Sequence, residues 1–300
     1  MESQTETVIY NGPRGEKFTR FIKSLLEKSK IKEKYLKALL TSESIQEYSK
    51  AFTSITANET ENYEIFEQLG DVSANKFIVW YAYKRFPQLM CTLGVKVVAR
   101  LRINYGARQS FSKIGDSLGF WEFISATEEE RGHKKKDLLE DCVESFCGCT
   151  EYLLDNIFMP GVGYAIVAQI LGSIFDTIPI SLRYEDLYDA KTRLKELFDM
   201  YKDLGTWAYI SVRDDKLVKA KIYLVPKGMS KRAHERKAIN ERGQQIVIKS
   251  PVRGWTEIGE GVAAKKSDAE QKAAEMGLRY LNRKGYKKPI SAEYRRFMNQ

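Results

Sequence analysis

Three carboxylates stand at helical spacing in the first half of the chain. Glu64, Glu67 and Asp71 are three and four residues apart in the stretch NYEIFEQLGD, so a helix would place all three on one face. Like charges at such spacings cost a helix about 0.2–0.5 kcal/mol per pair. A divalent cation held outside the helix is the first explanation for keeping them together.

A second acidic pair, Asp141 and Glu144, is three residues apart in LLEDCVESF and shares one face of another amphipathic helix. This pair could converge with Glu67 and Asp71 in the interior of a bundle. Oxygen ligands without histidine suit Mg²⁺ or Mn²⁺ and argue against zinc. Two such ions are a known device for in-line phosphodiester hydrolysis. Surface helices also carry acids at these spacings, so spacing alone does not establish convergence.

The neighbours of these acids favour a partly buried face. Gly70 lies among the first group although glycine costs helix stability, which indicates close packing of helices. Leu138, Val143 and Phe146 flank the second pair. Buried carboxylates need hydrogen-bond partners or a metal ion.

The elements around the acids are helical. From about Phe18 to Phe175 apolar residues recur every three to four positions, and no convincing period-two run appears. We therefore expect an all-α domain at residues 18–180. The polar residues 1–17 are expected to form a flexible N-terminus.

The pattern changes after Tyr184. An amphipathic helix is followed by TWAYISV, KLVKAKIYLV and EIGEGVA, which alternate apolar and polar residues, and then by the helical KKSDAEQKAAEMGLRYLNRKG. The order α-β-β-β-α predicts a small α+β domain with an antiparallel sheet at residues 185–286. An insertion near 227–254 separates the second and third strands, and residues 287–300 have the composition of a basic tail.

Charge is divided unequally along the chain. Residues 186–300 hold 26 Lys and Arg against 15 Asp and Glu, whereas residues 1–185 hold 23 against 25. The net charge of +9 therefore arises in the C-terminal part, which is typical of a polyanion-binding surface. A solvated basic face without a ligand is the alternative on charge alone.

Cysteines and apolar segments bear on the compartment. The four cysteines lack C-x-x-C spacing and a nearby histidine, which argues against zinc and favours free thiols in a reducing compartment. The N-terminus lacks the apolar segment of a signal peptide. The apolar stretch 158–175 is interrupted by Pro160 and Gln169, so we expect a buried core helix. We expect a soluble intracellular protein, cytoplasmic or nuclear, that is neither secreted nor bound to a membrane.

The two acidic motifs resemble those of the ribonuclease III family. The family signature, roughly E-R-L-E-F-L-G-D-S, appears as EIFEQLGDV, and the second motif, roughly A-D-x-x-E-A-x-x-G, appears as EDCVESFCG. Asn75 falls where many members have asparagine. The C-terminal part is similar to a double-stranded RNA-binding domain through AKTRLKEL and GEGVAAKKSDAEQKAAEMGL. The resemblance covers about residues 30–285.

The resemblance implies a metal-dependent endonuclease that acts on double-stranded RNA. The acids that match the family's four metal ligands are Glu67, Asp71, Asp141 and Glu144. Glu64 matches the outer glutamate of the signature and is a further catalytic candidate. The implied cofactor is Mg²⁺, with Mn²⁺ as a substitute. Family members act as homodimers that cut opposite strands, leaving 5′-phosphate and 3′-hydroxyl ends and a short 3′ overhang.

The resemblance also assigns RNA contacts in the C-terminal domain. Lys265 and Lys266 open the last helix, where free backbone N–H groups and two cations suit phosphates. Lys191, Thr192 and Glu196 match the opening helix of the RNA-binding domain. Without the family match, the lysine pair would be taken as a solvated helix start. Binding to RNA should depend strongly on salt.

Three features depart from the family pattern. Gln68 replaces an aromatic residue that packs into the partner subunit, so the dimer contact must differ or be weaker. RDDK at 213–216 replaces the G-P-x-H loop of the RNA-binding domain. The insertion is either a replacement RNA contact, which we favour, or an ordinary solvated loop. Among the residues that make it basic are Lys227, Lys231, Arg232, Arg236, Lys237, Arg242 and Lys249.

The leading hypothesis is thus an active, dimeric double-stranded RNA endonuclease. The divergent signature and the compact layout resemble eukaryotic or large-DNA-virus members more than bacterial ones. A non-cleaving protein that sequesters duplex RNA, for example a silencing suppressor, is the alternative, and a scaffold subunit of a processing complex is a third. The four retained acids argue against sequestration.

Overall fold

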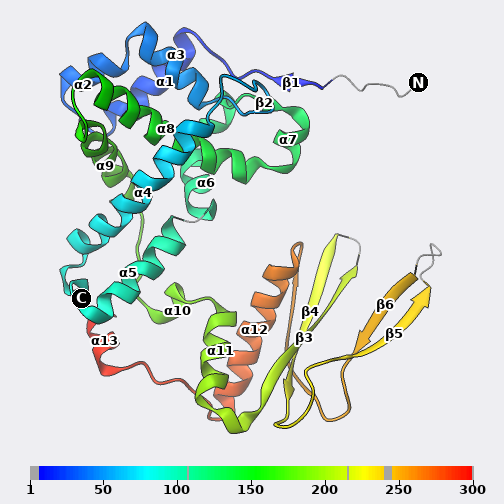
Figure 1. Ribbon diagram of the computed structural model, residues 1–300. Helices are drawn as coiled ribbons and strands as arrows, with labels where there is room; N and C mark the ends of the chain where they lie inside the picture. The colour runs from blue at the N-terminus through cyan, green and yellow to red at the C-terminus, as the bar shows by residue number, and fades with distance from the viewer. Residues whose placement is uncertain (1–6, 107, 215, 240–244, 299–300) are drawn as a thin grey trace, which may run out of the picture. The chain divides into compact units, whose positions relative to one another are not determined.

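The chain divides into two compact units, Met1–Ile180 and Ser181–Gln300, and each has its own hydrophobic core (Figure 1). The computed structural model describes residues 7–106, 108–214, 216–239 and 245–298.

The first unit is built from helices, as the apolar period predicted. They are α1 (Glu16–Glu27), α2 (Glu33–Leu39), α3 (Ser42–Ala51), α4 (Glu64–Arg85), α5 (Thr92–Tyr105), α6 (Arg108–Ser117), α7 (Glu128–His133), α8 (Lys135–Ile157) and α9 (Val162–Phe175). The long helices α4 and α8 pack against each other and carry the two acidic groups. Three cysteines of α8 are buried free thiols, whereas Cys91 is free and exposed.

Helices α4 and α8 meet backbone to backbone. A Cβ atom on Gly70 would lie 1.8 Å from the carbonyl oxygen of Glu144, and one on Gly148 would lie 1.9 Å from the carbonyl oxygen of Phe66. Only glycine permits such an approach, because any Cβ would overlap the facing helix. The close packing predicted from Gly70 is confirmed.

The N-terminal segment corrects one expectation. Of the supposedly flexible residues 1–17, the first six lie outside the described part, but β1 (Ile9–Tyr10) pairs with β2 (Ala126–Thr127). The guanidinium of Arg14 donates hydrogen bonds to the carbonyl oxygens of Phe52 and Phe123. These acceptors lie far along the chain, so local polarity gave no sign that the segment is anchored.

The second unit contains α10 (Tyr184–Leu187), α11 (Ala190–Met200), β3 (Thr206–Asp214), β4 (Leu217–Val225), β5 (His234–Ile239), β6 (Gln245–Ser250), β7 (Thr256–Ala263), α12 (Lys266–Arg283) and α13 (Ala292–Met298). Strands β3, β4 and β7 form an antiparallel sheet in that order, and α12 packs on it beside α11 (Figure 1). Buried Leu194, Ile222 and Ala273 join the helices to the sheet. The predicted small α+β fold is confirmed.

Two segments of this unit hold more structure than the sequence pattern indicated. The insertion near 227–254 contains the hairpin β5–β6, which forms a sheet of its own; residues 240–244 lie outside the described part. Helix α13 forms within the expected basic tail, 287–300. Its Tyr294 is buried and donates a hydrogen bond to the carbonyl oxygen of Leu182 at 3.1 Å. An aromatic anchor therefore holds this segment to its own unit.

The apolar stretch 158–175 forms the core helix α9, in which Ile166, Val167 and Ile170 are buried. Among the described residues, no helix combines the length and apolar character needed to cross a membrane.

Gly70→Ala should lower the free energy of unfolding by about 3 kcal/mol, because a new methyl group must push α4 away from α8. Gly132→Ala is the matched control: its Cβ would meet nothing within 4 Å in α7, so stability should stay equal or rise by up to about 1 kcal/mol. Urea denaturation measures both. Equal stability of the Gly70→Ala variant and the wild type would contradict the backbone contact.

Candidate active site

Helices α4 and α8 bring both acidic groups to one pocket of about 580 Å³. It contains all five predicted catalytic acids and a sixth, Glu140, which directly precedes Asp141 but belongs to neither predicted acidic group. The residues that line the pocket are Glu64, Ile65, Glu67, Gln68, Asp71, Gly106, Glu140, Asp141 and Glu144.

The donor set of this pocket suits a hard divalent cation. Its ionisable lining residues are six carboxylates, without histidine or cysteine. Within the described residues, no three His, Cys, Asp or Glu side chains stand close enough together to hold a metal ion as they are placed. Mutual repulsion keeps carboxylates apart where no cation joins them. The donor types of the pocket therefore fit Mg²⁺, and ligand contacts would require these side chains to move closer together.

Two neighbouring side chains orient the acids. The side-chain amide of Asn75 donates a hydrogen bond to Asp71 Oδ1 at 2.6 Å. The hydroxyl of Tyr63 donates to Asp141 Oδ2 at 3.1 Å. Tyr63 is buried immediately before α4, and an aromatic residue at such a place in a sequence indicates only core packing. Its role at the site was therefore missed.

The pocket holds an excess of negative charge. Burial, followed by the carboxylates of Asp71 and Glu140, raises the pKa of Glu144 to about 9. Burial, followed by the carboxylate of Asp141, raises the pKa of Glu67 to about 7. The carboxylates of each helix thus disfavour the ionised form of acids on the other helix. A bound cation would reduce this repulsion.

Three predicted RNA contacts gather where α11 and α12 begin. Lys191 Nζ lies 2.6 Å from Glu270 Oε2, and Lys266 Nζ lies 3.8 Å from Glu270 Oε1. Lys265, directly before α12, is exposed. The structure thus brings these lysines to one end of the second unit.

The other two predicted RNA contacts, Thr192 and Glu196, hydrogen-bond to side chains that hold local structure. Thr192 donates from its hydroxyl to Asp189 Oδ2 at 2.7 Å, at the N-cap of α11. Glu196 accepts from Lys288 Nζ at 2.8 Å and from the hydroxyl of Tyr184. Both side chains thus stabilise local structure.

The turn between β3 and β4 is short. Asp214 pairs with Leu217, which leaves two residues between the strands; one of them, Asp215, lies outside the described part. No loop comparable to the G-P-x-H loop of the resemblance can be formed by two residues.

Comparison with known proteins gives sequence relatives of one kind. The chain is 44% identical over 239 residues to "Putative ribonuclease 3" of Invertebrate iridescent virus 6, covering 75% of this chain and 82% of the relative. It is 37% identical over 266 residues to "Putative ribonuclease 3" of Frog virus 3 (isolate Goorha), covering 88% and 62%. Ribonuclease 3 of Nitrosomonas europaea is 30% identical over 145 residues, covering 47% and 54%. A scan against models of protein families finds no match.

Solved structures match more weakly. The nuclease domain of ribonuclease III from Campylobacter jejuni covers 52% of this chain and 96% of its own, with 21% identity and a TM-score of 0.40. Dicer from Pichia stipitis covers 78% and 92%, with 14% identity and a TM-score of 0.33.

The structure defines a protein of two units, a helical one with a carboxylate pocket and an α+β one rich in Lys and Arg. Its 44% identity to a relative, over most of both chains, shows that it belongs to the ribonuclease III family. It is an endoribonuclease of the ribonuclease III type, as its acidic motifs indicated.

In metal-free buffer, Glu144→Gln should stabilise the protein at pH 8.5 and have little effect at pH 5. The folded state keeps the Glu144 proton up to about pH 9, whereas the unfolded chain releases it near 4.5. Wild-type stability is therefore lost as the pH rises between these values. We expect a gain of about 1–3 kcal/mol, because each pKa unit is worth about 1.4 kcal/mol. Urea midpoints at both pH values test this, and a less stable variant at pH 8.5 would contradict it.

Proposed function

We propose that the protein is a Mg²⁺-dependent homodimeric endonuclease that hydrolyses phosphodiester bonds of double-stranded RNA, with Mn²⁺ as a substitute metal. The products carry 5′-phosphate and 3′-hydroxyl ends. The observation that supports this most is that the two acidic groups of α4 and α8 line one pocket, in a member of the ribonuclease III family.

The metal would be held by the four acids that match the family motifs, Glu67, Asp71, Asp141 and Glu144. A bound Mg²⁺ supplies Lewis-acid polarisation of the phosphate and activation of water. The hydrogen bond from Asn75 orients the carboxylate of Asp71, and that from Tyr63 orients the carboxylate of Asp141. Glu64 and Glu140 add negative charge at the rim, which strengthens attraction for the cation.

Protons and the cation compete for the buried acids. Because the pKa of Glu144 is raised to about 9 and that of Glu67 to about 7, metal binding displaces protons near neutral pH. Affinity for Mg²⁺ should therefore rise with pH over this range. This coupling is a property of the pocket and does not depend on the RNA.

The second unit supplies affinity for the duplex. A-form RNA hides its base edges in a deep groove, so proteins bind its phosphates, 2′-hydroxyls and shape. Lys191, Lys265 and Lys266 lie together where α11 and α12 begin, and they suit a row of phosphates. Two sites in a homodimer would cut opposite strands and leave a short 3′ overhang.

Asp71→Asn and Glu144→Gln should each lower the rate of duplex RNA cleavage at least about 100-fold with Mg²⁺, because each removes a metal ligand. Glu129→Gln, at an exposed acid of α7, is the matched control and should cleave normally. Gel analysis of a long duplex with Mg²⁺, Ca²⁺ or EDTA measures the products. If the wild-type protein binds the duplex tightly but leaves it uncleaved under every condition, the protein sequesters duplex RNA and is not a nuclease.

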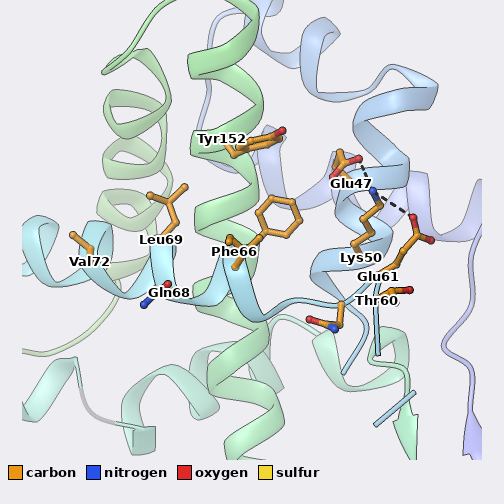
Figure 2. A pocket seen from close by; sticks show the side chains of 11 residues that line it. Glu47, Lys50, Thr60, Glu61, Phe66, Gln68, Leu69, Val72 and Tyr152 are labelled. Carbon is orange, nitrogen blue, oxygen red and sulfur yellow. Dashed lines mark hydrogen bonds and ion pairs between the residues drawn. The ribbon is translucent and has the colours of Figure 1, made fainter. Parts of the chain in front are cut away.

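A second surface of α4 supports the homodimer. Ile65 and Val72 are 72% and 63% exposed, large values for aliphatic side chains. They line a pocket of about 720 Å³, where Figure 2 shows Leu69 and Val72 projecting from α4 on the same side as the ring of Phe66, near Tyr152 of α8. The ring of Phe66 lies 5.6 Å from that of Tyr152. This apolar surface suits a second copy of the chain.

The surface also accounts for the departure at Gln68. In Figure 2 its side chain points away from Leu69, so it does not fill the role of the family's aromatic residue. The exposed aliphatic side chains next to it would provide the contact area instead. A salt-bridged rim, with Lys50 Nζ 3.0 Å from Glu47 Oε1 and 3.6 Å from Glu61 Oε1, borders the pocket.

Val72→Arg should convert the dimer to a monomer at micromolar concentration, because it places a charge in an apolar interface. Val95→Arg is the matched control, since Val95 on α5 is 56% exposed outside this surface, and it should remain dimeric. Light scattering gives the mass of each variant. A monomeric wild type, or a dimeric Val72→Arg variant, would contradict the proposed interface.

A further inference from the structure

The hairpin β5–β6 is a separate two-stranded sheet inserted between β4 and β7, standing beside the three-stranded sheet (Figure 1). Its base is fixed to the second unit by aromatic contacts. Lys231 Nζ lies 5.1 Å from the ring centre of Trp207, and the rings of Trp255 and Tyr223 are 5.9 Å apart. The hairpin is therefore a basic arm with an anchored base.

Neither face of the hairpin is uniformly apolar, as a sheet face that packs against a core would be. Residues opposite each other in an antiparallel ladder share a face. One face holds Lys237 opposite Val247, and the other holds Arg236 opposite Ile248. All four side chains are exposed, Val247 by 54%. Because each face mixes a cation with an aliphatic group, the sheet lacks the one-sided apolar pattern that packs against a core.

The charge of the arm is largely uncompensated. Residues 227–254 contain eight Lys and Arg against two Glu. Lys249 Nζ lies 2.8 Å from Glu235 Oε1, but neither Arg236 nor Lys237 has an ion-pair partner among the residues that the structure describes. A two-stranded sheet alone is marginally stable in water. Contact with a partner would therefore stabilise the folded hairpin. The excess of positive charge favours a polyanion as that partner.

The fold also leaves a place for this contact. Only two residues separate the paired Asp214 and Leu217, fewer than the four of the family's G-P-x-H loop, so this loop is not available as a duplex contact. The lysines at the start of α12 then lack a second contact along the RNA. A basic arm from the same unit would provide one.

We propose that the hairpin β5–β6 is a second double-stranded RNA contact of this protein, binding phosphates without regard to sequence. This inference rests on the proposed function. Cations on both faces allow the ribbon to lie between two rows of phosphates, with Arg236 directed to one row and Lys237 to the other. A protein partner is disfavoured because Lys is depleted at protein interfaces and the positive charge of residues 227–254 exceeds their negative charge by six.

The test uses the full-length Glu144→Gln protein, so that binding is measured without cleavage. Arg236→Gln with Lys237→Gln should weaken binding of a 30-base-pair RNA duplex about tenfold and lower the salt dependence by about two charges. The matched control, Lys28→Gln with Lys32→Gln, removes two exposed charges from the first unit and should bind normally. Thermal unfolding should show equal stability, because all four side chains are exposed.

Lys265→Ala with Lys266→Ala separates failure of this inference from failure of the proposed function. If that variant binds weakly while the hairpin variant binds as tightly as its control, the second contact is overturned and duplex binding stands. If the Glu144→Gln protein itself does not bind duplex RNA, both are overturned. Normal RNA binding with an altered mass in light scattering would show that the hairpin contacts a second copy of the chain instead.

Discussion

The candidate site depends on one contact, the backbone approach of α4 to α8 at Gly70 and Gly148. It sets the distance between two helices that carry acids on facing sides. With any larger residue at these positions the helices would have to move apart, which would increase the distance between the two acidic groups. The same approach buries Glu144, which is 5% exposed. Gly70 and Gly148 therefore determine both the spacing of the two helices and the burial of Glu144.

The packing of the surrounding helices stabilises the site, whereas repulsion among its carboxylates destabilises it. Six carboxylates in one pocket repel each other, and the burial of Glu144 adds a desolvation penalty for its charged form. The aromatic and aliphatic core of the first unit supplies the packing energy that offsets this repulsion. Functional sites commonly lower stability in this way. Tyr63 and Asn75 limit the cost by satisfying one carboxylate oxygen each on Asp141 and Asp71.

The second unit keeps the α-β-β-β-α fold while its polar surface differs from the family pattern. The β3–β4 turn is reduced to two residues, and Glu196 is paired with Lys288. Basic residues are concentrated instead at the start of α12 and on β5–β6. Phosphate recognition tolerates such relocation, because it needs positive charge at a suitable spacing and no particular base contact.

The sequence by itself determined the local features. Apolar periods of 3.6 and 2 depend on neighbouring residues alone, so they predicted both fold classes, and spacing placed Glu67 and Asp71 on one helix face. The family resemblance added the two motifs. Only the tertiary structure decided that α4 crosses α8 where these acids meet. It also showed that Tyr63 reaches Asp141 and that Arg14 anchors the N-terminal segment. These contacts join residues distant in the chain, and no local pattern specifies which helix faces will pack together.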